Sequence, residues 1–296
     1  MPEGRVTRAY SGHYYVESGG ETFDCVARGR LRKERKEVLV GDMVSFSVTG
    51  PGSGAIEDIL PRKSRLVRPP VANVDQAVVV MACDDPEPDL ELLDRMLVAV
   101  GAAGLGAVVC FNKMDLVSDY ASRKLARIYK RAGYTVVRAS ARARWGLRAL
   151  RRALAGKISV FSGPSGVGKS ALLNALEPGL RLRCGEISAK TGRGRHTTRH
   201  SMLLSVQPDG FVADTPGFSK LDLDLTGLRR ENLGDLFPEF AAVRDRCRFT
   251  GCLHHKEPGC AVKAAVEAGE VSESRYTHYV KFLEEIIEAE RKGKFW

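Results

Sequence analysis

The chain has 296 residues, of which 44% are hydrophobic and 28% are charged, the composition of a folded protein with room for two or three domains. No apolar run approaches the roughly twenty residues that a membrane-spanning helix needs. The N-terminus has no apolar signal-peptide core, so we expect a cytoplasmic protein. Nothing in the sequence indicates an oligomer, and we expect a monomer.

The formal net charge is +10, and the basic residues are concentrated in two stretches. Between Arg123 and Lys157 there are twelve Lys and Arg residues and no Asp or Glu. A second stretch, 181–199, has six basic residues and a single acidic one, Glu186. Such a local excess favours an RNA partner. The alternative is a solvated surface that keeps the protein soluble.

Residues 1–66 predict a small closed β-barrel, because short strand-type runs alternate with turn sequences. The expected strands are Gly4–Tyr10, His13–Ser18, Glu21–Ala27, Met43–Val48 and Ala55–Ile59. An OB-type barrel is expected, although an SH3-like barrel has much the same sequence signature. The basic residues between Arg28 and Lys36 are expected to lie on a loop.

Residues 67–224 predict an α/β domain with a mostly parallel sheet that helices cover on both faces. The expected strands are Gln76–Cys83, Gly106–Phe111, Tyr134–Ala139, Ile158–Ser162, Met202–Val206 and Gly210–Ala213. Between them we expect helices near Leu90–Ala102, Tyr120–Arg131 and Leu147–Leu154, and a further helix after the glycine-rich loop that follows Ser162.

That loop has the sequence G-x-x-x-x-G-K-S and lies between a strand-type run and an apolar helical face, the context in which the motif binds phosphate. Its glycines can turn backbone N–H groups toward one point, at the positive end of the helix. Lys169 is expected to reach the β- and γ-phosphates and to assist catalysis, and Ser170 to place its hydroxyl on Mg²⁺. The expected nucleotide contacts are Gly163, Pro164, Ser165, Gly166, Val167, Gly168, Lys169, Ser170 and Ala171.

A guanine-binding motif, N-K-x-D, follows the strand that ends at Phe111. Asp115 can accept hydrogen bonds from N1–H and the exocyclic amino group of guanine, and adenine has no donor at either position. Asn112, followed by Lys113, can hold the purine edge and tie the base loop to the phosphate loop. Ser140-Ala141 follows the next strand and can bring a backbone N–H to the guanine oxygen; the alternative there is an ordinary loop.

Two further segments resemble nucleotide-sensing switches. Asp214 is expected to hold Mg²⁺ through water, and the N–H of Gly217 to sense the γ-phosphate. The polar, glycine-rich run 192–200 has the composition of a switch segment. Within it Thr198, or alternatively Thr197, is expected to bind Mg²⁺ and to take part in catalysis.

The order of the motifs indicates a circular permutation. GTPases usually run from phosphate loop to D-x-x-G to N-K-x-D, whereas here N-K-x-D comes first. The second switch therefore leads directly into the C-terminal domain through residues 218–225. We expect this tether to transmit the nucleotide state to that domain.

Residues 225–296 predict a zinc-binding helical domain. Cys247, Cys252, His254 and Cys260 have the spacing of a closed tetrahedral Zn²⁺ site with a structural role. His255 is the alternative imidazole ligand. Helices are expected near Cys260–Ala268 and Glu273–Glu290.

With these motifs identified, the chain resembles the circularly permuted GTPases that depend on the small ribosomal subunit, the RsgA (YjeQ) family. The resemblance spans almost the whole length. It implies an OB barrel, a permuted GTPase domain and a zinc-containing helical domain. It also implies GTP hydrolysis stimulated by the small ribosomal subunit, and a role in late maturation of that subunit through contact with ribosomal RNA. The segments that carry it are Pro61–Ser64, Val71–Gln76, Asn112–Asp115, Gly163–Ser170, Gly194–Thr198, Asp214–Phe218 and Cys247–Cys260.

The residue after D-x-x-G limits the mechanism, because this chain has Phe218 where many GTPases have a water-orienting Gln. We therefore expect slow intrinsic hydrolysis that a partner completes. His196 is the candidate catalytic residue, since an imidazole can align water or accept its proton; the alternative is that His196 contacts RNA or solvent. Gly166 stands where some GTPases place an Asn that recruits K⁺, which argues against a K⁺ requirement.

Two functions fit these residues. The first is a GTPase that acts as a switch in ribosome assembly. The second is an RNA-binding assembly factor in which GTP occupancy matters and hydrolysis is incidental. An ATP-dependent kinase or motor is opposed by the guanine-binding motif.

Overall fold

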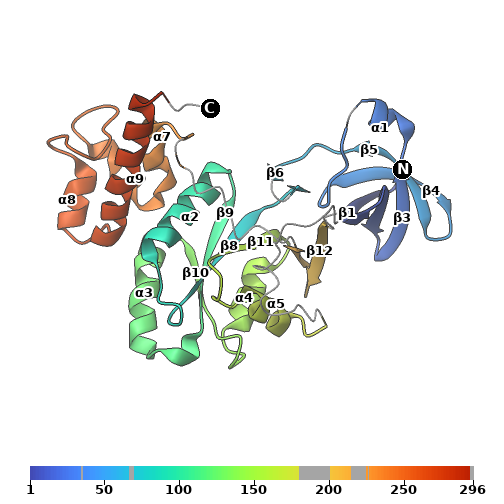
Figure 1. Ribbon diagram of the computed structural model, residues 1–296, viewed down its shortest axis with the longest axis horizontal. Helices are drawn as coiled ribbons and strands as arrows, with labels where there is room; N and C mark the ends of the chain where they lie inside the picture. Colours follow the sequence, from blue (N-terminus) through green and yellow to red (C-terminus); the bar gives the residue numbers. More distant parts are fainter. Residues whose placement is uncertain (35, 67–69, 180–200, 215–224, 226, 294–296) are drawn as a thin grey trace.

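The computed structural model describes residues 1–34, 36–66, 70–179, 201–214, 225 and 227–293. In this part of the chain a β-barrel, an α/β unit and a small helical unit follow one another along the longest axis of the molecule (Figure 1). None of the described helices is long and apolar enough to cross a membrane.

The N-terminal unit is a closed five-stranded barrel. Its strands, β1 (Glu3–Tyr10), β2 (His13–Ser18), β3 (Glu21–Ala27), β4 (Met43–Gly50) and β5 (Ser53–Ile59), pair in the order β1-β2-β3-β5-β4. β1 also pairs with β4, which closes the barrel. Every second side chain of a strand points inward, and the core includes Val6, Val16, Cys25, Phe46 and Ile56.

From the sequence we expected the basic run between β3 and β4 to be a loop. This prediction is wrong for residues Gly29–Lys33, which form the short helix α1. Leu31 explains the difference. Its side chain is fully buried in the barrel core, and a helical turn allows it to point inward while Arg30 and Glu34 face solvent.

The middle unit is an α/β sheet of the predicted kind. β10 (Thr135–Arg138), β9 (Gly106–Asn112), β8 (Gln76–Ala82), β11 (Ile158–Ser162) and β13 (Gly210–Asp214) are parallel neighbours in this order, and β12 (Ser201–Val206) runs antiparallel beside β13. α2 (Leu90–Ala102) and α3 (Asp119–Arg131) pack on one face. α4 (Leu147–Leu154) and α5 (Lys169–Leu176) pack on the other.

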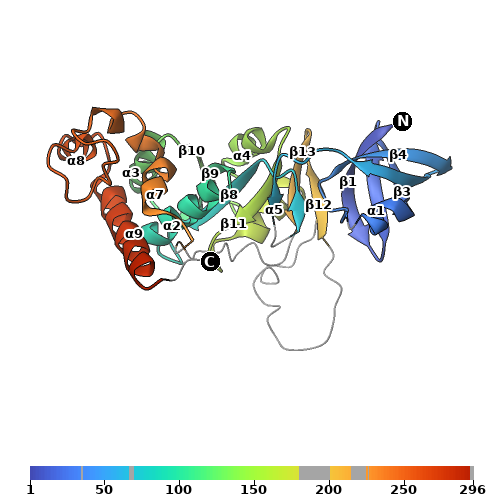
Figure 2. The ribbon, with the colours of Figure 1, turned by 90° about the horizontal axis from the view of Figure 1, so that it is seen from above.

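The barrel and the α/β unit share one continuous sheet of eleven strands, which we did not expect from the sequence. β1 pairs antiparallel with β12, with Arg8 opposite Met202 and Ala9 opposite Ser201. The guanidinium carbon of Arg5 also lies 5.0 Å from the ring centroid of Phe211 in β13. The barrel is thus attached to the β12–β13 hairpin (Figure 2).

Hydrogen bonds from polar side chains hold the barrel against the segment that follows it. Arg62 donates two hydrogen bonds to the buried carboxylate of Asp42, at 2.6 and 2.8 Å. Asn73 follows the small hairpin of β6 (Arg65–Leu66) and β7 (Val71–Ala72), and its amide donates to the carbonyl of Gly41 at 3.0 Å. These contacts explain why the Pro61–Ser64 and Val71–Gln76 motifs are needed structurally.

The C-terminal unit combines one long helix with shorter helical segments around an aromatic core that includes Phe237, Phe240, Tyr279 and Phe282. Its elements are α7 (Arg230–Leu233), the 3₁₀ turns η2 (Gly234–Leu236), η3 (Pro238–Phe240) and η4 (Arg244–Arg246), α8 (Ala261–Glu267) and α9 (Glu273–Arg291). Leu225 and Val98 of α2 extend this core, so the C-terminal unit packs directly on the α/β unit.

Charged side chains line the contact between α9 and α2. Arg275 is 1% exposed and forms ion pairs with Asp94 and Glu239. Asp94 also bonds to His278. Arg95 adds a two-pronged pair with Glu285, in which both N–O distances are 2.7 Å.

Candidate nucleotide-binding and metal sites

The phosphate loop leaves β11 at its carboxyl end and leads into α5. Gly163 and Gly168 both have positive φ angles, 142° and 90°. A Cβ on Gly163 would lie 2.1 Å from the carbonyl oxygen of Val80, and a Cβ on Gly168 would lie 2.4 Å from Nδ2 of Asn112. Only glycine fits at these two positions, since both the backbone angle and the neighbouring atoms exclude a side chain.

The side chain of Lys169 folds back over this loop. Its Nζ donates to the carbonyl oxygens of Gly163 and Pro164, each at 2.7 Å. Only 5% of the residue is exposed, and this burial lowers the pKa of Lys169 from its usual 10.5 to about 8. Ser170 follows in the first turn of α5 and is 7% exposed. The cation and the hydroxyl therefore lie side by side at the helix N-terminus.

Asn112 joins the phosphate loop to the base-binding loops. Its side chain is 1% exposed and lies at the end of β9. Its Nδ2 donates to the carbonyl of Val167 at 2.8 Å, and its Oδ1 accepts from the N–H of Ala141 at 3.2 Å. One amide thus fixes three segments of the chain relative to one another.

A pocket of about 260 Å³ opens beside Asn112. Its lining comes from the loops that follow β8, β9 and β10 and from the start of α5. The lining residues are Asp85, Asn112, Lys113, Asp115, Leu116, Ala141, Arg142, Gly168 and Ala171. The size, and a lining in which apolar surface is combined with a few polar groups, suit a purine base that enters from the phosphate loop.

Asp115 places a carboxylate in the lining of this pocket. The Ser140 hydroxyl donates to its carboxylate at 2.5 Å and is the main cause that lowers the pKa of Asp115. The same hydroxyl accepts from the N–H of Ala143 at 2.9 Å, which fixes its orientation. The carboxylate is therefore ionised and oriented at neutral pH, as an acceptor of two guanine N–H groups must be.

Two supporting residues were missed in the sequence. Trp145 exchanges backbone hydrogen bonds with Ser140 at 3.0 and 3.1 Å, and so closes the Ser140-Ala141 loop. The carbonyl of Asp85, in the loop after β8, accepts from the ammonium group of Lys113. Neither residue belongs to a recognised motif, because the hydrogen bonds that support the pocket come from their backbone groups.

Asp214 is the last residue of β13, and its backbone pairs with that of Met202. β13 and β11 are parallel neighbours, so Asp214 lies at the edge of the sheet from which the phosphate loop departs. His196, Thr197, Thr198, Gly217 and Phe218, and the tether 218–224, lie outside the described residues.

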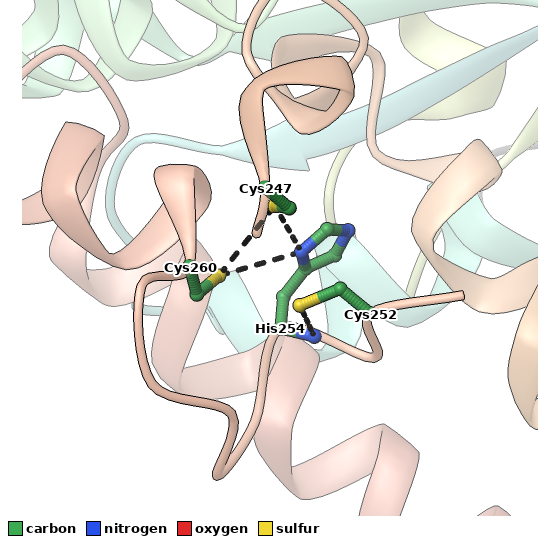
Figure 3. A group of neighbouring side chains, drawn as sticks. All are labelled: Cys247, Cys252, His254 and Cys260. Carbon is green, nitrogen blue, oxygen red and sulfur yellow. Dashed lines mark hydrogen bonds between the residues drawn. The ribbon is translucent and has the colours of Figure 1, made fainter. Parts of the chain in front are cut away.

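Three cysteines and one histidine gather in the C-terminal unit (Figure 3). Nδ1 of His254 lies 3.6 Å from Sγ of Cys247 and 3.5 Å from Sγ of Cys260, and these two sulfurs are 4.0 Å apart. With Cys252, the four ligand atoms lie within 4.8 Å of one another. A tetrahedral Zn²⁺ site with ordinary bond lengths has S–S edges of about 3.8 Å and S–N edges of about 3.5 Å, so the cluster fits one such ion.

The alternative ligand, His255, lies outside this cluster, and its Nε2 is 3.2 Å from the carboxylate of Glu284. Glu257 is part of the Cys247–Cys260 segment that carries the resemblance, but the sequence suggested no role for it, and in the structure it holds the ligand loop. Its carboxylate accepts from the N–H of Leu253 and the N–H of His255, both at 2.9 Å.

The motifs converge although their chain order is rotated. The phosphate loop follows β11, D-x-x-G begins at the end of β13, N-K-x-D follows β9 and Ser-Ala follows β10, all at the carboxyl edge of one sheet. This arrangement, together with the barrel and the Cys₃His cluster, defines a circularly permuted GTPase with two flanking units.

Comparison with known proteins identifies the family. The RsgA GTPase profile matches residues 59–224, and the RsgA N-terminal domain profile matches residues 3–56. The small ribosomal subunit biogenesis GTPase RsgA of Moorella thermoacetica is 51% identical over 290 residues, 98% of this chain and 99% of its own. The Geobacillus sp. protein of the same name is 47% identical over 298 residues, 100% of both chains. The chain belongs to the RsgA GTPase family.

Two solved structures share the architecture over nearly the whole chain. YjeQ from Thermotoga maritima superimposes with a TM-score of 0.83 at 39% identity, covering 97% of this chain and 98% of its own. YloQ, described as a circularly permuted GTPase, gives a TM-score of 0.82 at 40% identity, covering 97% and 96%. The expected fold class is therefore confirmed.

Proposed function

We propose that this protein is a GTPase that binds the small ribosomal subunit and hydrolyses GTP to GDP and phosphate as a switch in late maturation of that subunit. The observation that carries the proposal is the bridge made by Asn112, which joins a guanine-type pocket to a phosphate loop. The relatives that match the whole chain carry the name small ribosomal subunit biogenesis GTPase.

Each part of the nucleotide has a proposed partner in the site. Asp115 accepts from the guanine edge, with the Ser140-Ala141 loop at the guanine oxygen. The backbone of residues 163–171 cradles the phosphates, and Lys169 exchanges its carbonyl partners for phosphate oxygens. Because a triphosphate is more negative than two carbonyls, this exchange favours the charged lysine.

Magnesium fits the oxygen donors that we expect at this edge. The hydroxyl of Ser170, the carboxylate of Asp214 and the hydroxyl of Thr198 or Thr197 are hard ligands of the kind that Mg²⁺ prefers. When bound, the ion would neutralise charge on the β- and γ-phosphates. The N–H of Gly217 is proposed to sense the γ-phosphate.

Hydrolysis is proposed to be slow until a partner completes the site, because Phe218 cannot orient water. His196 is the proposed water-orienting residue. A His196→Ala protein should keep its GTP affinity and lose most of the hydrolysis that the subunit stimulates. Full stimulated turnover in this variant would exclude the catalytic role.

A single structural Zn²⁺ is proposed for Cys247, Cys252, His254 and Cys260. The distances among the ligand atoms of Cys247, His254 and Cys260 are close to those of a tetrahedral site, and all four ligand atoms lie within 4.8 Å of one another. Four protein ligands leave no open position for a substrate or water, so the ion stabilises the C-terminal unit and supplies no chemistry.

The proposed partners are the small ribosomal subunit and its ribosomal RNA, and the proposed location is the cytoplasm, where the subunit matures. The concentration of positive charge between Arg123 and Lys157 supports an RNA partner. We propose that the protein acts as a monomer, since one chain supplies all the residues assigned to the site.

Steady-state GTP hydrolysis with and without purified small ribosomal subunits tests the function, with ATP as the control nucleotide. Strong stimulation that is confined to GTP is the expected result. Tight GTP binding without stimulation would instead favour an assembly factor in which hydrolysis is incidental. A variant that binds GTP and does not hydrolyse it separates the two functions, because only a switch would then stay on the subunit.

A further inference from the structure

One part of the α/β unit collects positive charge that the nucleotide site does not use. The outward side of α3 carries five exposed basic residues and, after Asp119 in its first turn, no acidic residue. A hollow of about 340 Å³ lies along this helix beside β10, the last strand of the sheet. It is lined by Arg123, Ala126, Arg127, Lys130 and Arg138, and we call it the α3 groove.

The cations of the α3 groove differ in how they are held. Asp119 bonds to both Arg123 and Arg138 at 2.6 Å, which fixes these two side chains at one end. Arg127 and Lys130 pair with no carboxylate in the part of the chain that the structure describes. Since an ordinary protein surface intersperses charges of both signs, unpaired cations around a hollow indicate an anionic ligand.

The lining also indicates which kind of anion fits. Apart from the buried Ala126, every residue that lines the groove is a long, flexible cation, and none is aromatic. The lining residues therefore offer no aromatic ring on which an unpaired base could stack, and the ring of the neighbouring Trp145 lies against the guanidinium of Arg138. Recognition of single-stranded RNA relies largely on aromatic stacking. Cations spaced along a helix instead match the phosphates of a double-helical backbone, which are read by charge and shape.

The α3 groove also adjoins the guanine pocket. Arg138 places its guanidinium carbon 5.5 Å from the ring centroid of Trp145, and Trp145 exchanges backbone hydrogen bonds with Ser140. Ser140 in turn donates to Asp115. A phosphate backbone that engages Arg138 would thus touch a chain of contacts that ends at the base-reading carboxylate.

From these observations we infer that the α3 groove binds the phosphate backbone of double-helical ribosomal RNA. This inference rests on the proposed function and adds to it the surface that contacts the subunit. It places the RNA on α3, at the end of the sheet away from the barrel (Figure 1).

The test is a double variant, Arg127→Gln with Lys130→Gln, titrated against purified small ribosomal subunits at several salt concentrations. Each lost phosphate contact reduces the slope of log affinity against log salt by about 0.9, so the slope should fall by about 2 and the affinity by roughly 10- to 30-fold at 0.15 M salt. The control, Arg291→Gln with Lys292→Gln, removes the same formal charge from the end of α9 and should leave the slope unchanged.

An unchanged affinity and slope in the double variant would overturn the inference, provided that both variants keep the GTP affinity of the parent protein. A second titration uses a short duplex RNA and a single strand of the same length. Loss of binding to the duplex alone is expected, and equal loss for the single strand would contradict a duplex ligand. If the parent protein fails to bind subunits, the proposed function fails, and the duplex titration alone decides the α3 groove.

Discussion

Arg8 of the barrel and Asp214 of the α/β sheet are aligned across three adjacent strands of the continuous sheet, with Met202 between them. Met202 pairs with Asp214 on one side and with Arg8 on the other. Asp214 is a proposed Mg²⁺ ligand at the end of β13. Only β12 separates β13 from β1 of the barrel in the sheet. The barrel is thus placed to respond to the nucleotide through the backbone of β12.

We therefore predict that a non-hydrolysable GTP analogue slows amide hydrogen exchange in β1, because nucleotide binding stabilises the β12–β13 hairpin with which β1 pairs. The measurement compares peptides from β1 and from β3, with and without the analogue. Among the strands that the structure describes, β3 pairs with β2 and β5 and not with β12, so it serves as the internal control. Equal responses in both strands would contradict transmission through β12.

The second prediction concerns base choice. Asp115→Asn replaces an acceptor of two N–H groups by a side chain that also donates, so the preference should shift from GTP toward xanthosine triphosphate, which has an oxygen where guanine has its amino group. Hydrogen bonds to a charged acceptor are typically worth about 1.5–3 kcal/mol, so their loss should cost a factor of about 10 or more in affinity. Competition binding measures the shift. Asp119→Asn, the same change outside the pocket, should leave the preference for GTP intact.

The third prediction follows from the pKa of Lys169, which burial lowers to about 8. A triphosphate stabilises the charged ammonium and raises this pKa again, so binding takes up protons at pH values above about 8. At pH 8.5 the uptake should be about three quarters of a proton, and at pH 7 about a tenth. Calorimetry of GTP binding in buffers of different ionisation enthalpy measures it. A binding heat that is independent of the buffer at pH 8.5 would disprove the assignment.

The fourth prediction concerns the Cys₃His cluster. The protein should contain one zinc per chain, and Cys252→Ser should lower this content and the unfolding temperature of the C-terminal unit, since a structural metal contributes directly to folding. GTP affinity should persist, because no ligand of the cluster lines the base pocket. Cys25→Ser, at a buried cysteine of the barrel, should retain one zinc. A full zinc content in Cys252→Ser would rule out the proposed ligand set.

The fifth prediction contrasts two ion pairs between α9 and α2. Arg275→Met removes the guanidinium from the buried carboxylates of Asp94 and Glu239 and leaves Asp94 with its bond to His278, which should cost about 3–5 kcal/mol of unfolding free energy. Lys281→Met removes an exposed pair with Glu91 and should cost less than about 1 kcal/mol. Urea unfolding compares the two variants. Similar losses would mean that burial does not decide the strength of these pairs.

Much of this fold follows from local sequence patterns. The predicted strands and helices agree with the observed ones to within one or two residues, because hydrophobic periodicity and turn residues act locally. The β1–β12 pairing was not predictable in this way, since strands of two units meet there without a shared motif. Leu31 was likewise missed, because a single apolar residue in a basic run gives no periodic signal.

The candidate site likewise contains some residues that the sequence predicts and others that it does not. The phosphate loop and N-K-x-D are recognisable because their chemistry requires particular side chains at fixed spacing. The hydrogen bonds by which Trp145 and Asp85 support the pocket come from backbone groups that any residue has, so no sequence pattern indicates them. Glu257 bonds to two backbone amides of its own loop, and an isolated glutamate before Pro-Gly gives too little signal to predict that.

The shared sheet also sets the distance between the barrel and the α3 groove. The six strands from β10 to β12 span five gaps, and strands lie about 4.8 Å apart, so the sheet separates its two ends by about 24 Å. The barrel is fused to one end through β12, and the α3 groove lies beside the other end. Because a hydrogen-bonded sheet resists stretching, the distance between these two surfaces is fixed. Only a partner whose contact points have the matching spacing can engage both surfaces at once.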